Sequence, residues 1–214
     1  MKKQETPAQP KVVPDAVADF FLRPIGTGVL MGMGAALNLT ACGYMGAFLS
    51  SLGLIFVWSS SSPMLTTLVG REKLTGNFWL YANVVGGNIL GAVLVAALFL
   101  RGGFVGDDDL AICREYLSAQ TYSEIAIKSF FCGALLHFLF KSWGQSHGVF
   151  IAALGAAAIS YCGLNHYITD AFYWRLNHWL LTPEPFVKLS LAVCGNVLGA
   201  VGINFVTKKR AFLL

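Results

Sequence analysis

Charged residues are scarce in this chain. They make up 12% of its 214 residues, whereas soluble domains carry about 25%. Hydrophobic residues make up 56%, and the mean hydropathy is +0.62. This composition excludes a soluble globular domain, and the sequence predicts an integral membrane protein.

Several kinds of functional site are also missing. The five cysteines are an odd number without a close pair, which argues against a disulfide framework and against a zinc site. No nucleophile is paired with a base, and there is no phosphate-binding loop or metal cluster, so we expect neither an enzyme nor a cofactor or metal site. No basic cluster alternates with aromatic residues, so nucleic acid is not an expected partner.

What the chain has instead is six long apolar runs. A membrane-spanning helix needs roughly 20 mostly apolar residues. The runs exceed the length of barrel strands and do not alternate in polarity, which favours helices. The predicted fold class is an all-α integral membrane protein with six transmembrane helices, at about 24–46, 47–69, 78–100, 124–143, 148–173 and 186–207.

The polar ends of the chain predict two cytoplasmic tails, at residues 1–23 and 208–214, around a transmembrane domain at 24–207. Residues 15–22 either form an amphipathic helix lying on the membrane or continue the first tail. The first residues lack the apolar core of a signal peptide.

One sequence word occurs twice. Gly-Asn-Ile-Leu-Gly-Ala at 87–92 recurs as Gly-Asn-Val-Leu-Gly-Ala at 195–200, an offset of 108 residues. The repeat predicts a duplicated half-protein, at about 24–100 and 124–207. Three spans in each half would turn the second half upside down, giving inverted repeats. Chance convergence of closely packed glycine-rich helices is the alternative. The residues predicted to pack the repeats are Gly87, Asn88, Gly195 and Asn196.

Positive charge is distributed unevenly along the chain. If the N-terminus is cytoplasmic, ten lysines and arginines lie inside and five lie outside, in agreement with the positive-inside rule. The predicted location is therefore the inner (plasma) membrane, with several crossings and both termini cytoplasmic. The longest loop, 101–123, is predicted to lie outside.

Two of the spans contain polar interruptions. In the second, serines at 59–62 precede Pro63, which removes a backbone donor. In the fifth, His166 and Asp170 lie in an apolar run, and ionisable residues at membrane depth indicate function. The repeat offset places the second break just after His166. Both breaks are candidate pore elements; the alternatives are a proline kink and a structural histidine.

Several short sequence motifs follow one another along the chain: Ser51-Leu52-Gly53-Leu54, Leu65-Thr66, Gly87-Asn88, Gly163-Leu164-Asn165-His166 with Phe172, and Gly195-Asn196. With these motifs in this order, the chain resembles the formate/nitrite transporter (FNT) family along nearly its whole length. The resemblance implies an aquaporin-like protomer, a pore through each protomer, and a homopentamer in the lipid bilayer. It also implies passage of small monovalent anions of weak acids, such as formate, nitrite or hydrosulfide.

The resemblance also implies roles for single residues. His166 matches the central histidine of the family, and Thr66 matches a threonine that hydrogen-bonds towards it. The residues implied on the substrate pathway are His166, Thr66 and Asn165, and those in the two hydrophobic constrictions are Leu54 with Ile159 and Met64 with Leu65.

The chain departs from the family pattern at several positions. A glutamate usually precedes the histidine, where Asn165 stands, and an asparagine usually stands at the place of Asp170. Gly133 replaces another asparagine. The usual lysine of the outer loop aligns near Leu117, and the basic residues closest to it are Arg114 and Lys128. The connection after the second span is short, which predicts a stubby or missing half-helix there.

The expected chemistry follows from the cost of desolvation. A bare anion pays a large penalty in an apolar constriction, whereas its neutral acid pays far less. His166 either gives the anion a proton or stays neutral and donates a hydrogen bond, while the proton comes from elsewhere; the sequence leaves both routes open.

Three other functions remain as alternatives. Asp170 favours a channel of the same fold for a small neutral or cationic solute. His137 and His166 could ligate haem in a membrane redox subunit. The chain could also be a scaffold that has lost transport.

Overall fold

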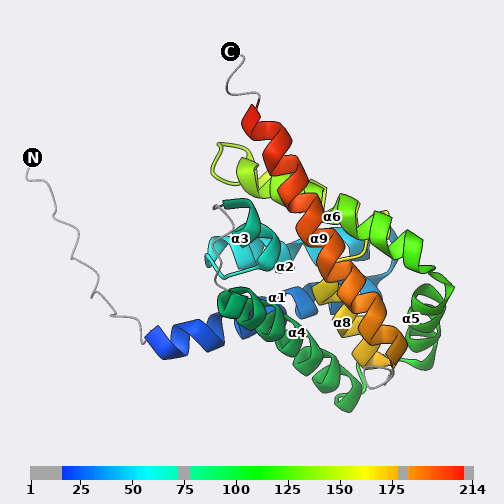
Figure 1. The fold of residues 1–214 in the computed structure, drawn as a ribbon. Coiled ribbons are helices and arrows are strands. Elements are labelled where there is room, and N and C mark those ends of the chain that lie inside the picture. Colours follow the sequence, from blue (N-terminus) through cyan, green and yellow to red (C-terminus); the bar gives the residue numbers. More distant parts are fainter. Residues whose placement is uncertain (1–15, 72–77, 178–182, 210–214) are drawn as a thin grey trace, which may run out of the picture.

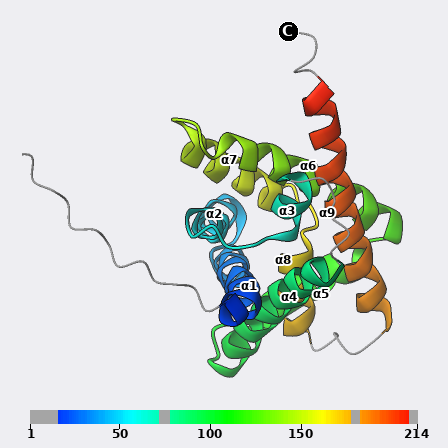
Figure 2. The same cartoon turned by 60° about the vertical axis from the view of Figure 1, so that its left-hand side comes forward.

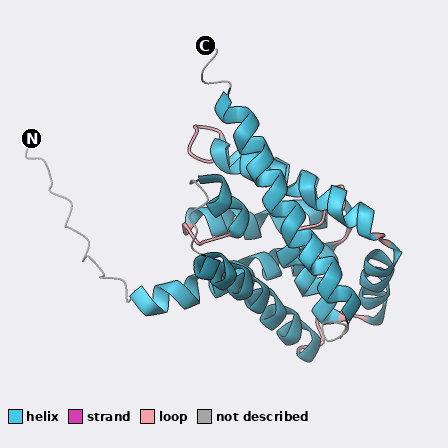
Figure 3. Ribbon diagram, viewed as in Figure 1, coloured by secondary structure: helices cyan, strands magenta, loops and turns pink. Residues whose placement is uncertain are grey.

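The computed structural model describes residues 16–71, 78–177 and 183–209, which form helices and loops without a strand (Figures 1 and 3). By length and composition, α1 from Asp19, α4, α6 and α9 to Thr207 can each cross a membrane. The chain is an all-α membrane protein. Its helices are α1 (Ala16–Ala41), α2 (Gly43–Ser59), α3 (Leu65–Arg71), α4 (Phe78–Arg101), α5 (Asp107–Ala119), α6 (Tyr122–Ser142), α7 (Gly148–Tyr161), α8 (Tyr167–Leu176) and α9 (Pro183–Lys209).

Two pairs of long helices frame the fold. α1 packs against α4, and α6 packs against α9 (Figures 1 and 2). Glycines permit both crossings: a Cβ on Gly91 of α4 would overlap the carbonyl oxygen of Ile25, and one on Gly199 of α9 would overlap that of Phe130. Small residues let helix backbones approach this closely, so dispersion contacts run along the whole crossing.

Two interrupted helices complete the arrangement. α2 and α3 are separated by residues 60–64, and α7 and α8 by residues 162–166. α2 has 17 residues and α7 has 14, so neither alone spans an apolar core about 30 Å thick at about 1.5 Å per residue. The half-helix α3 has only 7 residues, as expected from the short connection that follows it.

The second break lies before α8, so its predicted position just after His166 is wrong. α2 ends at Ser59 and α7 ends at Tyr161, an offset of 102 residues (161 less 59), whereas Asn88 and Asn196 are 108 apart. The half-helix that follows the break has 7 residues in the first half and 10 in the second. A constant offset fails because the two halves differ in length beyond their breaks.

The first helix begins earlier than predicted. Residues 16–22, predicted as a surface helix or tail, belong to α1 and continue directly into the first span. Pro24 lacks the N–H that would bond to the carbonyl of Phe20, and the amide nitrogen of Asn83 in α4 donates to that carbonyl at 2.6 Å. Residues 1–15 and 210–214 of the predicted tails lie outside the described residues.

A helix, α5, occupies much of the predicted outer loop. Its first turn contains Asp107, Asp108 and Asp109, and the Gly106 N–H donates to the Asp109 carboxylate at 3.0 Å. Negative side chains are favourable at a helix N-terminus. Cys113, buried on α5, lies on the helix that packs against α8. The acidic run therefore begins a helix that covers one end of the molecule.

Candidate functional site

A cavity of about 520 Å³ leads from the protein surface to the second break. Exposed residues of the α1–α2 corner and of the end of α7 line its outer part, and His166 lines its buried end. The walls come from α1, α2, α5, α6, α7 and α8. Polar groups from the break are thus presented to a space with mostly apolar walls.

His166 is the last residue of the break, directly before α8. Its side chain is 2% exposed, and neither imidazole nitrogen has a hydrogen-bond partner among the described residues. Buried polar atoms are paired as a rule, so this ring is available to a polar solute. The Thr66 hydroxyl is also buried and without a partner in the described part of the chain. The expected Thr66–His166 hydrogen bond is therefore not formed in this structure.

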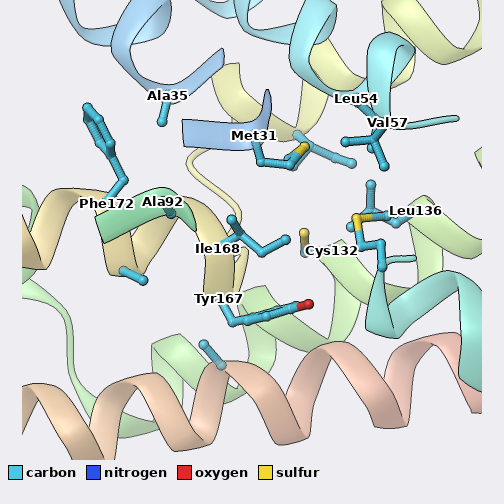
Figure 4. Close-up of a cluster of buried hydrophobic side chains, with 14 of the residues drawn as sticks. Met31, Ala35, Leu54, Val57, Ala92, Cys132, Leu136, Tyr167, Ile168 and Phe172 are labelled. Carbon is cyan, nitrogen blue, oxygen red and sulfur yellow. The ribbon is translucent and has the colours of Figure 1, made fainter. Parts of the chain in front are cut away.

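The residues matched to the two constrictions lie in different places. Leu54 and Ile159 are buried and line the same cavity as His166. Met64 and Leu65 are buried at the start of α3 and do not line it. Figure 4 shows Leu54 with Met31 and Leu136 in the apolar cluster. The first pair adjoins the open cavity, whereas the second lies in closely packed core.

The two departures beside the histidine belong to one hydrogen-bonded pair. The Asn165 side-chain nitrogen donates to the Asp170 carboxylate at 3.1 Å. The family pattern has an acid before the histidine and an amide four residues after it; here the acid and the amide have changed places. Asp170 lines the cavity and Asn165 does not. The exchange therefore moves a carboxyl group into the cavity wall.

Asn88 holds the first break in place. Its side-chain nitrogen donates to the carbonyl of Pro63 in the break, at 3.2 Å, and to the carbonyl of Pro24 in α1, at 2.8 Å. Gly87 packs on Pro24 so closely that an added Cβ would lie 2.5 Å from the Pro24 Cβ. One side chain thus joins a carbonyl of the break, which has no helix to satisfy it, to a carbonyl of α1.

Asn196 does the same in the second half. Its side-chain nitrogen donates to the carbonyl of Asn165 in the break, at 3.0 Å, and to that of Ser129 in α6, at 2.8 Å. A Cβ on Gly195 would overlap the Ser129 side chain. Pro63 and Asn165 each lie two residues before a half-helix, so the repeated Gly-Asn words hold equivalent points of the two breaks.

Tyr167, the first residue of α8, connects the two asparagines and was not predicted as a site residue. Its hydroxyl donates to the Asn88 side-chain oxygen at 2.5 Å, and its N–H donates to that of Asn196 at 3.1 Å. The ring is fully buried beside Ile168 (Figure 4). The available signal was its place directly after the interruption at 165–166. Tyr167 ties the His166 end of the second break to the asparagine that holds the first.

Two solved structures with a similar fold are described as channels. One, described as a pentameric formate channel with formate bound, superposes with a TM-score of 0.70 over 92% of this chain and 96% of its own, at 18% sequence identity. Another, described as an FNT family ion channel, has a TM-score of 0.75 over 92% of this chain and 91% of its own, at 14% identity.

The chain has the FNT fold. The resemblance expected from its sequence motifs is confirmed at the level of the fold. No protein-family model matches the chain, and no curated protein matches it.

The FNT fold as built here explains Gly133, which stands at the place of an asparagine. A Cβ on Gly133 of α6 would overlap the backbone carbonyl oxygen of Asn196 in α9. The two helices cross too closely for any side chain at this point. The departure is therefore a packing requirement of the α6–α9 crossing.

A buried lysine lies near the place where the FNT pattern has its outer-loop lysine. Lys188 of α9 is 4% exposed, and its ammonium group donates to the Leu117 carbonyl at 3.1 Å. It also pairs with Glu184 at 2.9 Å and lies 5.8 Å from the centre of the Trp174 ring. The sequence pointed to Arg114 and Lys128 because they are close in the chain, whereas Lys188 reaches Leu117 only through the fold. It does not line the cavity.

The geometry does not favour the haem alternative. His137 is buried in α6, and it is not among the residues that line the cavity containing His166. A haem between two histidines needs a space bordered by both. Among the described residues, no group of three or more histidines, cysteines and acids could hold a metal ion.

Proposed function

We propose that this chain is a membrane channel for small monovalent weak-acid anions of the formate, nitrite or hydrosulfide type. The observation that carries the proposal is His166, buried, without a protein hydrogen-bond partner, and at the inner end of a cavity that reaches the surface. Leu54 and Ile159 belong to the wall of the same cavity. A polar donor among apolar side chains suits a solute that crosses without charge.

The residues along the proposed pathway have different roles. The apolar walls at Leu54 and Ile159 exclude a hydrated anion, because removing its water shell costs several kcal/mol or more. His166 offers an N–H where the shell is lost, so a neutral acid exchanges hydrogen bonds to water for one to the protein. Thr66 and Asn165 belong to the same pathway in this proposal, with Met64 and Leu65 as the constriction beyond it.

The same proposal includes six membrane crossings in two inverted repeats. α2 with α3 forms one crossing and α7 with α8 another, in addition to the four long helices. The matched hydrogen bonds of Asn88 and Asn196, each to its own break, support the repeat. The excess of positive charge in the loops assigned inside supports cytoplasmic termini and an inner-membrane location.

Labelling of introduced cysteines tests the orientation. Ser118 is on the exposed side of α5, in the loop that the proposal places outside. In intact cells, a membrane-impermeant thiol reagent should therefore modify Ser118→Cys. The matched variant Ser146→Cys, in the exposed turn between α6 and α7, should react only after the cells are opened. The opposite pattern of labelling would invert the topology.

Flux through proteoliposomes tests the function itself. We expect purified protein to pass formate, nitrite and hydrosulfide, and to carry protons inward with them, because the neutral acid is the species that crosses. The purified particle should have the mass of five 23.1-kDa chains. Stopped-flow light scattering measures the anion flux, and an internal pH dye measures the proton flux. Vesicles that pass none of these anions faster than protein-free vesicles would refute the proposal.

One observation favours a second candidate, a channel for small neutral or cationic solutes. Asp170 lines the cavity, and none of the described residues lining it is a lysine or arginine. A carboxylate without a nearby cation opposes the entry of anions. Urea and ammonium flux in the same vesicles distinguishes the two: this candidate requires their passage and no passage of formate.

A further inference from the structure

The carboxyl group of Asp170 lies beside the candidate substrate site. Asp170 is in the first turn of α8, and its N–H donates to the His166 carbonyl at 2.9 Å. The side chain is 4% exposed and lines the cavity together with His166 and Thr169. A solute in contact with the imidazole therefore has a carboxyl group one helical turn away.

Apart from its place in the first turn of α8, which favours a negative charge, Asp170 has few groups that stabilise a carboxylate. Its side chain accepts a hydrogen bond from the Asn165 amide at 3.1 Å, and no lysine or arginine in the described ranges forms an ion pair with it. A carboxylate taken out of water without a cation is costly, whereas the neutral acid needs only hydrogen bonds. The geometry favours an acid that keeps its proton until a base such as an entering anion takes it.

The charged and titratable groups around Asp170 come from three elements. α5 contributes Tyr116, α8 itself contributes Tyr173 beside His166, and α6 contributes Cys132 and the half-buried Lys128. Tyr173 accepts a hydrogen bond from the Asn38 amide at 3.1 Å, and Tyr116 donates to the Gly163 carbonyl at 3.4 Å. The described parts of α1, α4 and α9 place no charged group against the carboxyl. Asp170 is therefore the carboxyl group that the described lining of the cavity offers to a solute.

We propose that Asp170 gives each entering anion the proton with which it crosses. This rests on the proposed function. The carboxyl O–H bond breaks, the proton forms the O–H or S–H bond of the neutral weak acid, and the carboxylate remains in the wall. The neutral acid then moves past His166 between Leu54 and Ile159. A proton from water in the cavity restores the carboxyl, so one proton crosses with each anion.

Asn165 has a defined part in this cycle. Its amide N–H donates to Asp170 in the structure, and a hydrogen bond to a charged acceptor is stronger than one to a neutral acceptor. The bond therefore strengthens when the proton leaves, and it holds the carboxylate until the next proton arrives. Its carbonyl is held in turn by Asn196 at 3.0 Å, which makes Asn165 a positioning residue.

Asp170→Asn tests the assignment, since it keeps the shape and removes the proton. We expect formate influx into proteoliposomes at alkaline external pH to fall about 100-fold or more, the low end of what proton transfer by a positioned side chain contributes. At acid pH, where the bulk supplies neutral acid, the variant should approach the parent. Asp170→Glu should retain most of the alkaline flux. Glu115→Gln, which removes an exposed carboxyl from α5, is the matched control and should follow the parent at every pH.

The other outcomes separate this inference from the proposed function. Asp170→Asn flux equal to or above the parent at every pH overturns the inference and leaves the channel intact. A parent without anion flux overturns both. If Asp170→Asn does not assemble, infrared spectra of the parent in H₂O and D₂O decide the point. The inference is supported by a protonated carboxyl band in the parent that responds to formate and that moves to another frequency in Asp170→Glu. A parent without such a band overturns the inference.

Discussion

His166→Phe should reduce anion flux by about 5- to 150-fold. The ring volume is largely kept. Among the described residues that line the cavity, however, His166 carries the only imidazole donor, and the substitution removes it. Leaving a buried polar group unpaired costs about 1–3 kcal/mol. In the variant, the unpaired group is the solute at the point where it is least hydrated. Each 1.36 kcal/mol in the barrier changes the rate tenfold. Proteoliposome flux of formate at one pH measures the ratio. Thr66→Val should have a smaller effect, because that hydroxyl does not line the cavity.

The control for this change is His147→Phe. His147 is exposed in the turn between α6 and α7, so the same replacement there should leave flux within about twofold of the parent. Both variants should elute as the parent does in size-exclusion chromatography. Normal assembly of His166→Phe with parental flux would show that the histidine only packs the helices and that the pore assignment is wrong.

Gly133→Asn, which restores the residue usual in the FNT pattern, should prevent stable assembly. Its Cβ would overlap the Asn196 carbonyl oxygen, so α6 and α9 would have to separate along their crossing. Overpacking in a close-packed core typically costs about 1–3 kcal/mol, occasionally more. The same shift would pull Asn196 from the carbonyl of Asn165. We expect a lower melting temperature and loss of the oligomer peak in detergent.

Gly86→Ala provides the matched control within a long helix. A Cβ at Gly86 of α4 meets nothing within 4 Å, and alanine is favoured over glycine in a helix by about 1 kcal/mol. This variant should assemble and melt at or above the parent temperature. If Gly133→Asn melts with the parent instead, then α6 and α9 do not cross as closely as described.

The positions of the helices could be predicted from the sequence because they depend on local patterns. Long apolar runs and few charges indicate membrane helices, and the four serines before Pro63 predicted the end of α2. The repeated Gly-Asn word indicated the two long helices that hold the breaks. α5 was missed because its apolar face is short and follows three aspartates, so its burial depends on contact with α8.

The partners of polar side chains could not be predicted in the same way. Asn165 bonds to Asp170 across the break, Tyr167 bonds to Asn88, and Lys188 reaches the Leu117 carbonyl. Each of these contacts depends on how far a helix is rotated and where it crosses its neighbour. Sequence periodicity records which face of a helix is apolar, but it does not record which residue on another helix lies opposite.

The sequence by itself determined that the chain is a membrane protein of helices, that two of those helices are interrupted, and that His166 stands at the second interruption. Composition and local pattern are sufficient for these properties because the bilayer imposes the same demand on every backbone group that enters it. Only the tertiary structure decided that Asp170 faces the cavity, that Gly133 must lack a side chain, and that Tyr167 joins the two halves. These depend on close packing of elements far apart in the chain, where a shift of one ångström changes which atoms can touch.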